Sequence, residues 1–284
     1  MITAPSTQLV PTTLGRLHVR VEGAGPVAML WHGMFVDGTS WDMVALQLSA
    51  HRTLVIVDGP AHGRSETLDR SSTITECATV AGEILDRLAI NGPVDWVGNA
   101  WGGHVGMRTA LDAPDRIRSL VAISAPPTPI SPELRRRITL LRPLLRTFGY
   151  RGPLLSAVLG SQLTVESTNS PDIRERVVDA LRRPNRAGVA RAITSFILDR
   201  EDMLADLHRL QAPTLFVASD DRGEFTQGDA QQAAQTASSG SWVVANGARA
   251  LVPLEQPQWL VDTVLQFWKV GGQVDRNGHP RCVS

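Results

Sequence analysis

The sequence predicts an α/β protein with a mostly parallel sheet and helices on both of its faces. Short apolar runs alternate with amphipathic helical stretches through the first 125 residues and again from residue 213, the order of elements that a parallel sheet requires. The chain has 284 residues, of which 43% are hydrophobic, enough for one large folded domain or two small ones. Disorder over the whole length is therefore excluded.

Two patterns indicate the strands. Residues 16–21 alternate between apolar and polar side chains, as an edge strand does. Residues 27–31, 53–57 and 94–97 are short apolar runs halted by Gly or Asp, which is typical of fully buried parallel strands. Further strands are expected at 120–123, 213–218 and 241–244.

The helices are indicated by apolar residues three and four positions apart. In residues 75–90 this spacing joins Val80, Ile84 and Leu88, and the Asn-Gly-Pro sequence at 91–93 ends the helix. Further helices are expected at 101–111, 134–148, 173–181 and 259–268.

The alternation of strands and helices stops between the proline-rich end of strand 120–123 and Pro213. Arginine-rich amphipathic helices fill this stretch, with 14 arginines against nine acidic residues in 127–212. Charged residues on an amphipathic helix usually form its solvated face. We interpret the stretch as a helical insertion with a solvated outer surface.

Charge and cysteine content restrict the partners and the compartment. Lys and Arg total 28 and so do Asp and Glu, so no net charge attracts the protein to nucleic acid or to a membrane. The two cysteines, Cys77 and Cys282, are too far apart for a disulfide framework or a zinc site. No apolar run approaches the roughly 20 residues of a membrane helix. A cytoplasmic protein is predicted.

One segment combines a strand, a glycine-framed turn and a helix. Strand 94–97 is followed by residues 98–103, GNAWGG, and at once by the helical pattern. This order is that of a nucleophile elbow, where glycines allow the close backbone approach of a strained turn. The segment resembles the α/β-hydrolase superfamily.

Three further segments resemble the same superfamily in order and spacing. Residues 32–35, HGMF, are similar to its oxyanion-loop motif. Residues 58–65, DGPAHGRS, are similar to its D-x-x-G-x-G-x-S turn, with Ala61 in place of the first glycine. Residues 247–257, GARALVPLEQP, are similar to its histidine loop, and the resemblance covers about residues 10–270.

The resemblance implies an α/β-hydrolase fold, with a mostly parallel eight-stranded sheet and a helical lid inserted before the last two strands. It divides the chain into a core of residues 1–126 and 213–270 and a lid of residues 127–212. Residues 271–284 are polar and contain glycine, which predicts a mobile tail. The implied relatives hydrolyse small, largely apolar ester, lactone or C–C substrates.

The residues at two positions of the implied Ser-His-Asp triad depart from the family. The nucleophile position at the elbow is Ala100, and the histidine position in residues 247–257 is Ala250. A methyl group can neither attack a carbonyl carbon nor accept a proton, so the triad mechanism cannot run in this sequence.

The other parts of the implied site are present. Asp221 follows strand 213–218 where the triad acid is expected, and a one-residue shift in that loop nominates Asp220 instead. The backbone N–H groups of Met34 and Trp101 are implied to form the oxyanion hole, which does not depend on their side chains.

Three further residues are expected at the pocket: His32, Phe35 and His104. His104 lies one helical turn after Ala100 and on the same face. A packed or hydrogen-bonded structural histidine is the alternative for His32 and for His104. No cluster has metal-ligand spacing, and the glycines after residue 97 do not match a dinucleotide loop, so neither a metal nor a cofactor is expected.

Three hypotheses account for the missing triad. The chain is a natural pseudo-hydrolase that binds a small apolar molecule, a favoured interpretation because Arg249 and Ala61 are also unusual. Alternatively it is a deliberately inactivated hydrolase with Ser and His changed to Ala, or a cofactor-independent enzyme that moves protons with His32, His104 or Asp221. Some of the apolar residues of the insertion, which include Leu140, Leu144 and Phe196, are expected to close over the elbow, and packing in the insertion's own core is the alternative for each of them.

Overall fold

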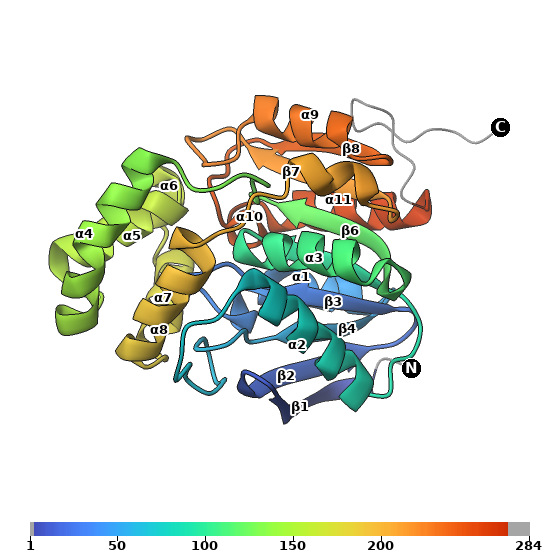
Figure 1. Cartoon of the computed structure of the whole chain (residues 1–284), viewed down its shortest axis with the longest axis horizontal. Coiled ribbons are helices and arrows are strands. Elements are labelled where there is room, and N and C mark those ends of the chain that lie inside the picture. Colours follow the sequence, from blue (N-terminus) through green and yellow to red (C-terminus); the bar gives the residue numbers. More distant parts are fainter. Residues whose placement is uncertain (1–2, 272–284) are drawn as a thin grey trace.

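The structure, a computed structural model, describes residues 3–271 and is built on an eight-stranded sheet (Figure 1). The spatial order of the strands is β1-β2-β4-β3-β5-β6-β7-β8. All neighbouring pairs from β4 to β8 are parallel, whereas β2 runs antiparallel to both β1 and β4. The strands are β1 (Thr3–Thr12), β2 (Gly15–Gly23), β3 (Val27–Trp31), β4 (Thr53–Val57), β5 (Val94–Asn99), β6 (Ile117–Ile123), β7 (Thr214–Ser219) and β8 (Gly240–Ala245).

The predicted fold class is confirmed, and the position of the edge strand is corrected. The alternating segment at 16–21 lies in β2, which pairs on both sides, and the edge strand is β1. β1 contains Pro5 and Pro11, which lack the N–H that a central strand must donate, so an edge is the place in a sheet that tolerates them. No periodic pattern marks this strand in the sequence.

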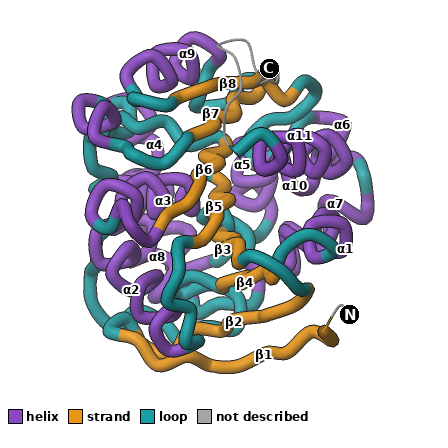
Figure 2. The backbone as a smooth tube through the Cα atoms, turned by 90° about the vertical axis from the view of Figure 1, so that its right-hand side faces the viewer, coloured by secondary structure: helices purple, strands orange, loops and turns teal. Residues whose placement is uncertain are grey.

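Helices cover both faces of the sheet, as Figure 2 shows along its edge. On one face lie α2 (Ile74–Arg87), α3 (Trp101–Asp112) and α9 (Gln227–Thr236), and on the other lie α1 (Asp42–Ser49), α10 (Val252–Glu255) and α11 (Pro257–Lys269). Each face has its own core, because consecutive residues of a strand point to opposite sides. Met29 and Trp31 of β3 enter the first core, and Ala28 and Leu30 enter the second.

The segment between β6 and β7 is helical and lies beyond one end of the sheet, on the left of Figure 1. It consists of α4 (Pro132–Phe148), α5 (Gly152–Gln162), α6 (Val165–Asn169), α7 (Pro171–Arg182), α8 (Arg186–Ile193), the π turn η3 (Thr194–Leu198) and the short 3-10 helix η4 (Ala205–Arg209). Two further 3-10 turns are η1 (Gly38–Trp41) and η2 (Pro114–Arg116). No residue of α4 is fully buried.

Two of the apolar residues of α4 are not among those that close over the elbow. Leu140 and Leu144 are 68% and 43% exposed, so they do not close over the elbow. Both lie on the side of the helix opposite Ile138 and Leu145, which pack against the core. Helical spacing alone identified an apolar residue without indicating which side of the helix faces the protein.

The predicted mobile tail, 271–284, lies outside the described residues except for Gly271. Among residues 3–271, no helix has the length and apolar character to cross a bilayer.

Candidate functional site

The turn after β5 positions Ala100 at the carboxyl end of the sheet. Its backbone angles are φ 48° and ψ −110°, in a region that side-chain-bearing residues rarely adopt. The Ala100 N–H donates to the Ile123 carbonyl at 2.7 Å, and the His104 N–H donates to the Ala100 carbonyl at 3.1 Å. The strand therefore passes into α3 through a strained turn that hydrogen bonds hold on both sides.

Glycines are required around this turn because the backbone segments touch. A Cβ atom on Gly98 would lie 2.2 Å from the Gly102 carbonyl oxygen, and one on Gly102 would lie 2.0 Å from that of Trp31. Both contacts are with backbone atoms, which cannot rotate away as a side chain can. The glycine framework thus packs β3, β5 and α3 together at the elbow.

His32 fixes the loop that faces the elbow. Its Nδ1 lies 2.6 Å from the Gly33 carbonyl and its Nε2 accepts from the Gly59 N–H at 2.9 Å, which assigns the proton to Nδ1. Burial lowers the pKa of His32 despite the nearby Asp58, which raises it, so the ring is neutral. Because the Gly33 carbonyl and the Met34 N–H belong to one peptide unit, His32 orients that N–H.

His62 supports the same loop from the neighbouring turn. Its Nε2 lies 2.5 Å from the Met34 carbonyl and its Nδ1 lies 2.9 Å from that of Pro60. Burial, followed by the adjacent His32, lowers the pKa of His62 to about 4. A neutral ring donates through one nitrogen at a time, and the shorter contact assigns the proton to Nε2, toward Met34.

Trp101 follows Ala100 and fills the space above the turn. Its indole stacks on Phe196 of η3, with ring centroids 4.7 Å apart, and meets His32 edge-on. Both aromatic side chains are almost completely buried. Within residues 3–271 the backbone N–H groups of Met34 and Trp101 donate to no protein acceptor. Two free peptide donors therefore flank the elbow.

His104 is buried on α3, one turn after Ala100. Its Nε2 lies 2.9 Å from the Pro126 carbonyl, and its Nδ1 has no partner within the described chain. Burial, and then the positive charge of Arg200, lower the pKa of His104 to about 3. His104 is therefore a neutral histidine that donates to the backbone, in agreement with the structural alternative.

The loop between β8 and α10 brings Ala250 to the elbow. The Asn99 side-chain amide, next to Ala100 in the chain, donates to the Ala250 carbonyl at 2.8 Å. Ala100, Ala250 and Phe35 are each partly exposed, whereas Asn99 is 1% exposed. Solvent thus reaches both methyl groups past buried neighbours.

The two aspartates after β7 have different partners. Asp220 accepts from the Gly247 N–H at 2.8 Å and is itself exposed. Asp221 forms an ion pair with the nearly buried Arg249, with 2.7 Å between Oδ2 and Nη2. Arg249 is unusual for its place in the loop motif, but no motif of the sequence predicts its pairing with Asp221.

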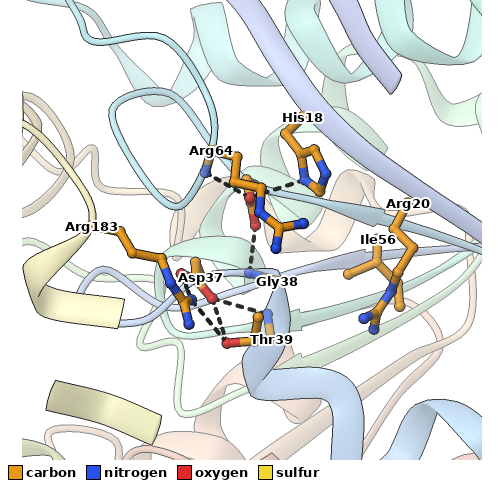
Figure 3. Close-up of a pocket in the computed structure, with 9 residues that line it drawn as sticks. His18, Arg20, Asp37, Gly38, Thr39, Ile56, Arg64 and Arg183 are labelled. Atoms are coloured by element: carbon orange, nitrogen blue, oxygen red, sulfur yellow. Dashed lines mark hydrogen bonds and ion pairs between the residues drawn. The ribbon is translucent and has the colours of Figure 1, made fainter. Parts of the chain in front are cut away.

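A second group of polar residues, of which only Asp58 and Arg64 belong to a motif of the sequence, surrounds a cavity of about 40 Å³ beside residues 32–35 (Figure 3). The Asp58 carboxylate accepts from the N–H groups of Gly38 and Arg64 at 2.7 and 2.9 Å and contacts His18. Burial opposes ionisation, but these contacts prevail and lower the pKa of Asp58. Arg183, at the end of α7, pairs with Asp37. The ion pair between Arg183 and Asp37 ties the end of α7 to the core.

Among the described residues, no three His, Cys, Asp or Glu side chains are grouped to hold a metal ion. Cys77 is buried in α2, where burial raises its thiol pKa, away from the elbow.

The fold and the geometry of this region define an α/β hydrolase, and the profile of the alpha/beta hydrolase family matches residues 28–263. The chain belongs to this family. It is 28% identical over 220 residues to pimeloyl-[acyl-carrier protein] methyl ester esterase of Nitrosomonas europaea, covering 72% of this chain and 80% of that protein. The protein of the same name from Vibrio vulnificus is 34% identical over 111 residues, covering 39% and 41%.

Solved structures show the same fold. A thermophilic esterase from Thermogutta terrifontis matches with a TM-score of 0.84 and 21% identity, covering 95% of this chain and all of that one. The enol-lactonase from Burkholderia xenovorans LB400 matches with a TM-score of 0.83 and 21% identity, covering 92% and 100%.

Proposed function

We propose that this α/β-hydrolase-family protein is a pseudo-hydrolase, which binds a small, largely apolar molecule at the elbow without serine-hydrolase turnover. The observation that carries the proposal is Ala100, a methyl group on the strained turn where the family's nucleophile belongs. Ala250 likewise stands where the family's general base, a histidine, belongs. Removing members of such a triad lowers turnover on the order of 10⁶-fold in a studied protease.

The free donors at the elbow support a ligand that carries a carbonyl oxygen. We assign the oxyanion hole to the N–H groups of Met34 and Trp101, which lack protein acceptors within residues 3–271. A peptide donor keeps its function when the nucleophile is lost, because it belongs to the backbone. Phe35 and Trp101 add apolar surface. We therefore expect esters, lactones or carboxylic acids with short apolar groups as ligands.

We propose that residues 127–212 are a lid over a core formed by 1–126 and 213–270. The stacking of Phe196 on Trp101 supports this division, because it places part of the insertion directly over the residue that follows the elbow. Lid residues 160–164 also contact the loop at 249–255. Apolar surfaces around a few aimed polar groups are typical of small-molecule sites.

Two other hypotheses receive less support. In a deliberately inactivated hydrolase only the Ser and His codons would be changed, yet Arg249 is also unusual and is bonded through its backbone and side chain. An enzyme using His32 or His104 for proton transfer would need a ring that reaches the substrate. Both rings are buried and donate to backbone carbonyls.

A thermal-shift screen with esters, lactones and short-chain acids tests the binding proposal. A ligand at about 100 times its Kd stabilises the folded state by roughly 2.7 kcal/mol, which raises the Tm by roughly 5 °C. Ala250→Phe should remove the shift because its ring enters the partly exposed space next to Asn99. Ala157→Phe, on an exposed position of α5, is the matched control. No shift with any compound contradicts the proposal.

Hydrolysis of activated esters tests the loss of turnover. The unchanged protein should hydrolyse p-nitrophenyl acetate and butyrate no faster than the Ala157→Phe control. Substantial hydrolysis that disappears in His32→Gln or His104→Gln would instead support the non-covalent enzyme. A cytoplasmic location stays a prediction.

A further inference from the structure

The loop at 247–255 is joined to the end of α5 by a set of hydrogen bonds that centres on Arg249. The Arg249 N–H donates to Glu255 Oε2 at 2.8 Å, and Glu255 Oε1 accepts from the Thr164 N–H at 2.7 Å. The Ala250 N–H donates to the Gln162 carbonyl at 3.1 Å. Glu255 thus joins the backbone of Arg249 to that of Thr164, which lies two positions after the end of α5.

The Arg249 side chain uses all of its nitrogens in the same region. Nε donates to the Asp221 carbonyl at 3.1 Å, Nη2 bonds to the Asp221 carboxylate at 2.7 Å, and Nη1 donates to the Gly160 carbonyl. The Arg249 carbonyl accepts from the Ser219 hydroxyl at the end of β7. The residue is 9% exposed, so these groups would lack partners if the contacts opened.

We propose that Arg249 is a positioning residue that has replaced the missing histidine as the partner of Asp221. Together with Asp221 and Glu255 it forms a clamp that holds residues 160–164 against the loop at 247–255. The assignment of Asp221 as the former triad acid rests on the proposed function. The clamp itself rests only on the hydrogen bonds and the burial of Arg249.

The clamp has a consequence for the site. A carboxylate that is paired with a guanidinium stabilises a neighbouring imidazolium less, because its charge is already compensated. Restoring Ser and His at positions 100 and 250 is therefore insufficient for efficient turnover. The arginine must also be removed, so that Asp221 becomes available to orient and charge-stabilise the new histidine.

Amide hydrogen exchange tests the clamp without any ligand or activity. In Arg249→Gln, the amides of Thr164 and Ala250 should exchange at least tenfold faster, while those of β5 stay protected. Arg222→Gln is the matched control, because Arg222 follows Asp221 on the loop between β7 and α9, is exposed and has no ion pair within residues 3–271.

Asp221→Asn provides a second variant should Arg249→Gln fold poorly. It keeps the side-chain size and the carbonyl contact with Arg249 Nε, and should give the same change to a smaller extent. Exchange rates in both variants equal to those of Arg222→Gln would overturn the clamp.

Ester hydrolysis tests the consequence for Asp221. Adding Arg249→Gln to the pair Ala100→Ser and Ala250→His should raise kcat/KM for p-nitrophenyl butyrate at least tenfold, and adding Arg222→Gln should not. Equal activity with and without Arg249 would refute the competition for Asp221. Inactivity of every combination would count against the assigned role of Asp221, and hydrogen exchange would still decide the clamp.

Discussion

The two sides of the proposed site, the elbow and the loop at 247–255, differ in what holds them in place. On the elbow side, the strained turn, the glycine contacts and the His32 bonds form a backbone architecture around Ala100. On the loop side, residue 250 is also an alanine. Its neighbour Arg249 binds Asp221 and the Gly160 carbonyl of α5. The elbow is therefore held by backbone contacts that are part of the core packing, whereas the loop is held by the hydrogen bonds of one side chain.

The largest effect should come from the glycines of the elbow. Gly102→Ala places a Cβ atom 2.0 Å from the Trp31 carbonyl oxygen, and neither backbone segment has room to move. We expect a loss of at least about 4 kcal/mol in the free energy of unfolding, measured with urea. Gly82→Ala in α2, where a new Cβ meets nothing within 4 Å, should instead stabilise by about 1 kcal/mol. Similar values for the two variants would show that the elbow is not tightly packed.

The sheet and the elbow were predictable because their patterns are local. Strands 27–31 and 53–57 agree with β3 and β4 at both ends, since a buried parallel strand is a continuous apolar run. The glycines in residues 98–103 predicted the turn between β5 and α3. β1 was missed because it has no periodic pattern of its own. Its structure is determined by its pairing with β2.

The next effect concerns the lid and compares two phenylalanines. Phe196 is 1% exposed and stacks on Trp101, whereas Phe148 at the end of α4 is 59% exposed. Phe196→Ala should lower the free energy of unfolding by roughly 3 kcal/mol, through lost burial and the cavity left above the elbow. Phe148→Ala should change it by less than about 0.5 kcal/mol. A small effect of Phe196→Ala in urea denaturation would separate the lid from the elbow.

The Arg249 pair could not be predicted, although both residues were noticed. Asp221 and Arg249 are 28 positions apart, and the Arg249 contact with Gly160 spans 89 positions. No spacing rule connects such residues, because folding alone decides which side chain a loop cation meets. The same holds for Arg183 and Asp37, which tie α7 to the oxyanion loop.

A pH effect should distinguish the buried His104 on the elbow side from the exposed His208 of η4. The pKa of His104 is lowered to about 3, below the ordinary 6.5, so the unfolded chain binds the proton more readily. The stabilisation from this group is complete above pH 6.5 and is lost as the pH falls toward 3. Between pH 6.5 and 4.5 we expect a loss of about 2 kcal/mol from His104.

His104→Gln isolates this contribution, because the amide can still donate to the Pro126 carbonyl but does not titrate. Its free energy of unfolding, measured with urea at each pH, should therefore decline less than that of the unchanged protein over the same interval. Parallel curves would mean that His104 is not kept neutral by burial. His208, which is exposed, provides the matched control as His208→Gln.

The smallest effect tests whether the backbone at Ala100 is strained. Ala100 has φ 48° and ψ −110°, where a Cβ atom is disfavoured and glycine is not. Ala100→Gly should therefore stabilise the folded state by about 1 kcal/mol, the relief of strain exceeding the extra freedom of the unfolded chain. Ala157→Gly, at an exposed helical position of α5, should destabilise by about 1 kcal/mol. If the two substitutions change the free energy of unfolding in opposite directions in urea denaturation, the turn at Ala100 is strained, and the packing of Gly98 and Gly102 enforces that strain. Destabilisation by both substitutions would mean instead that the turn at Ala100 is not strained.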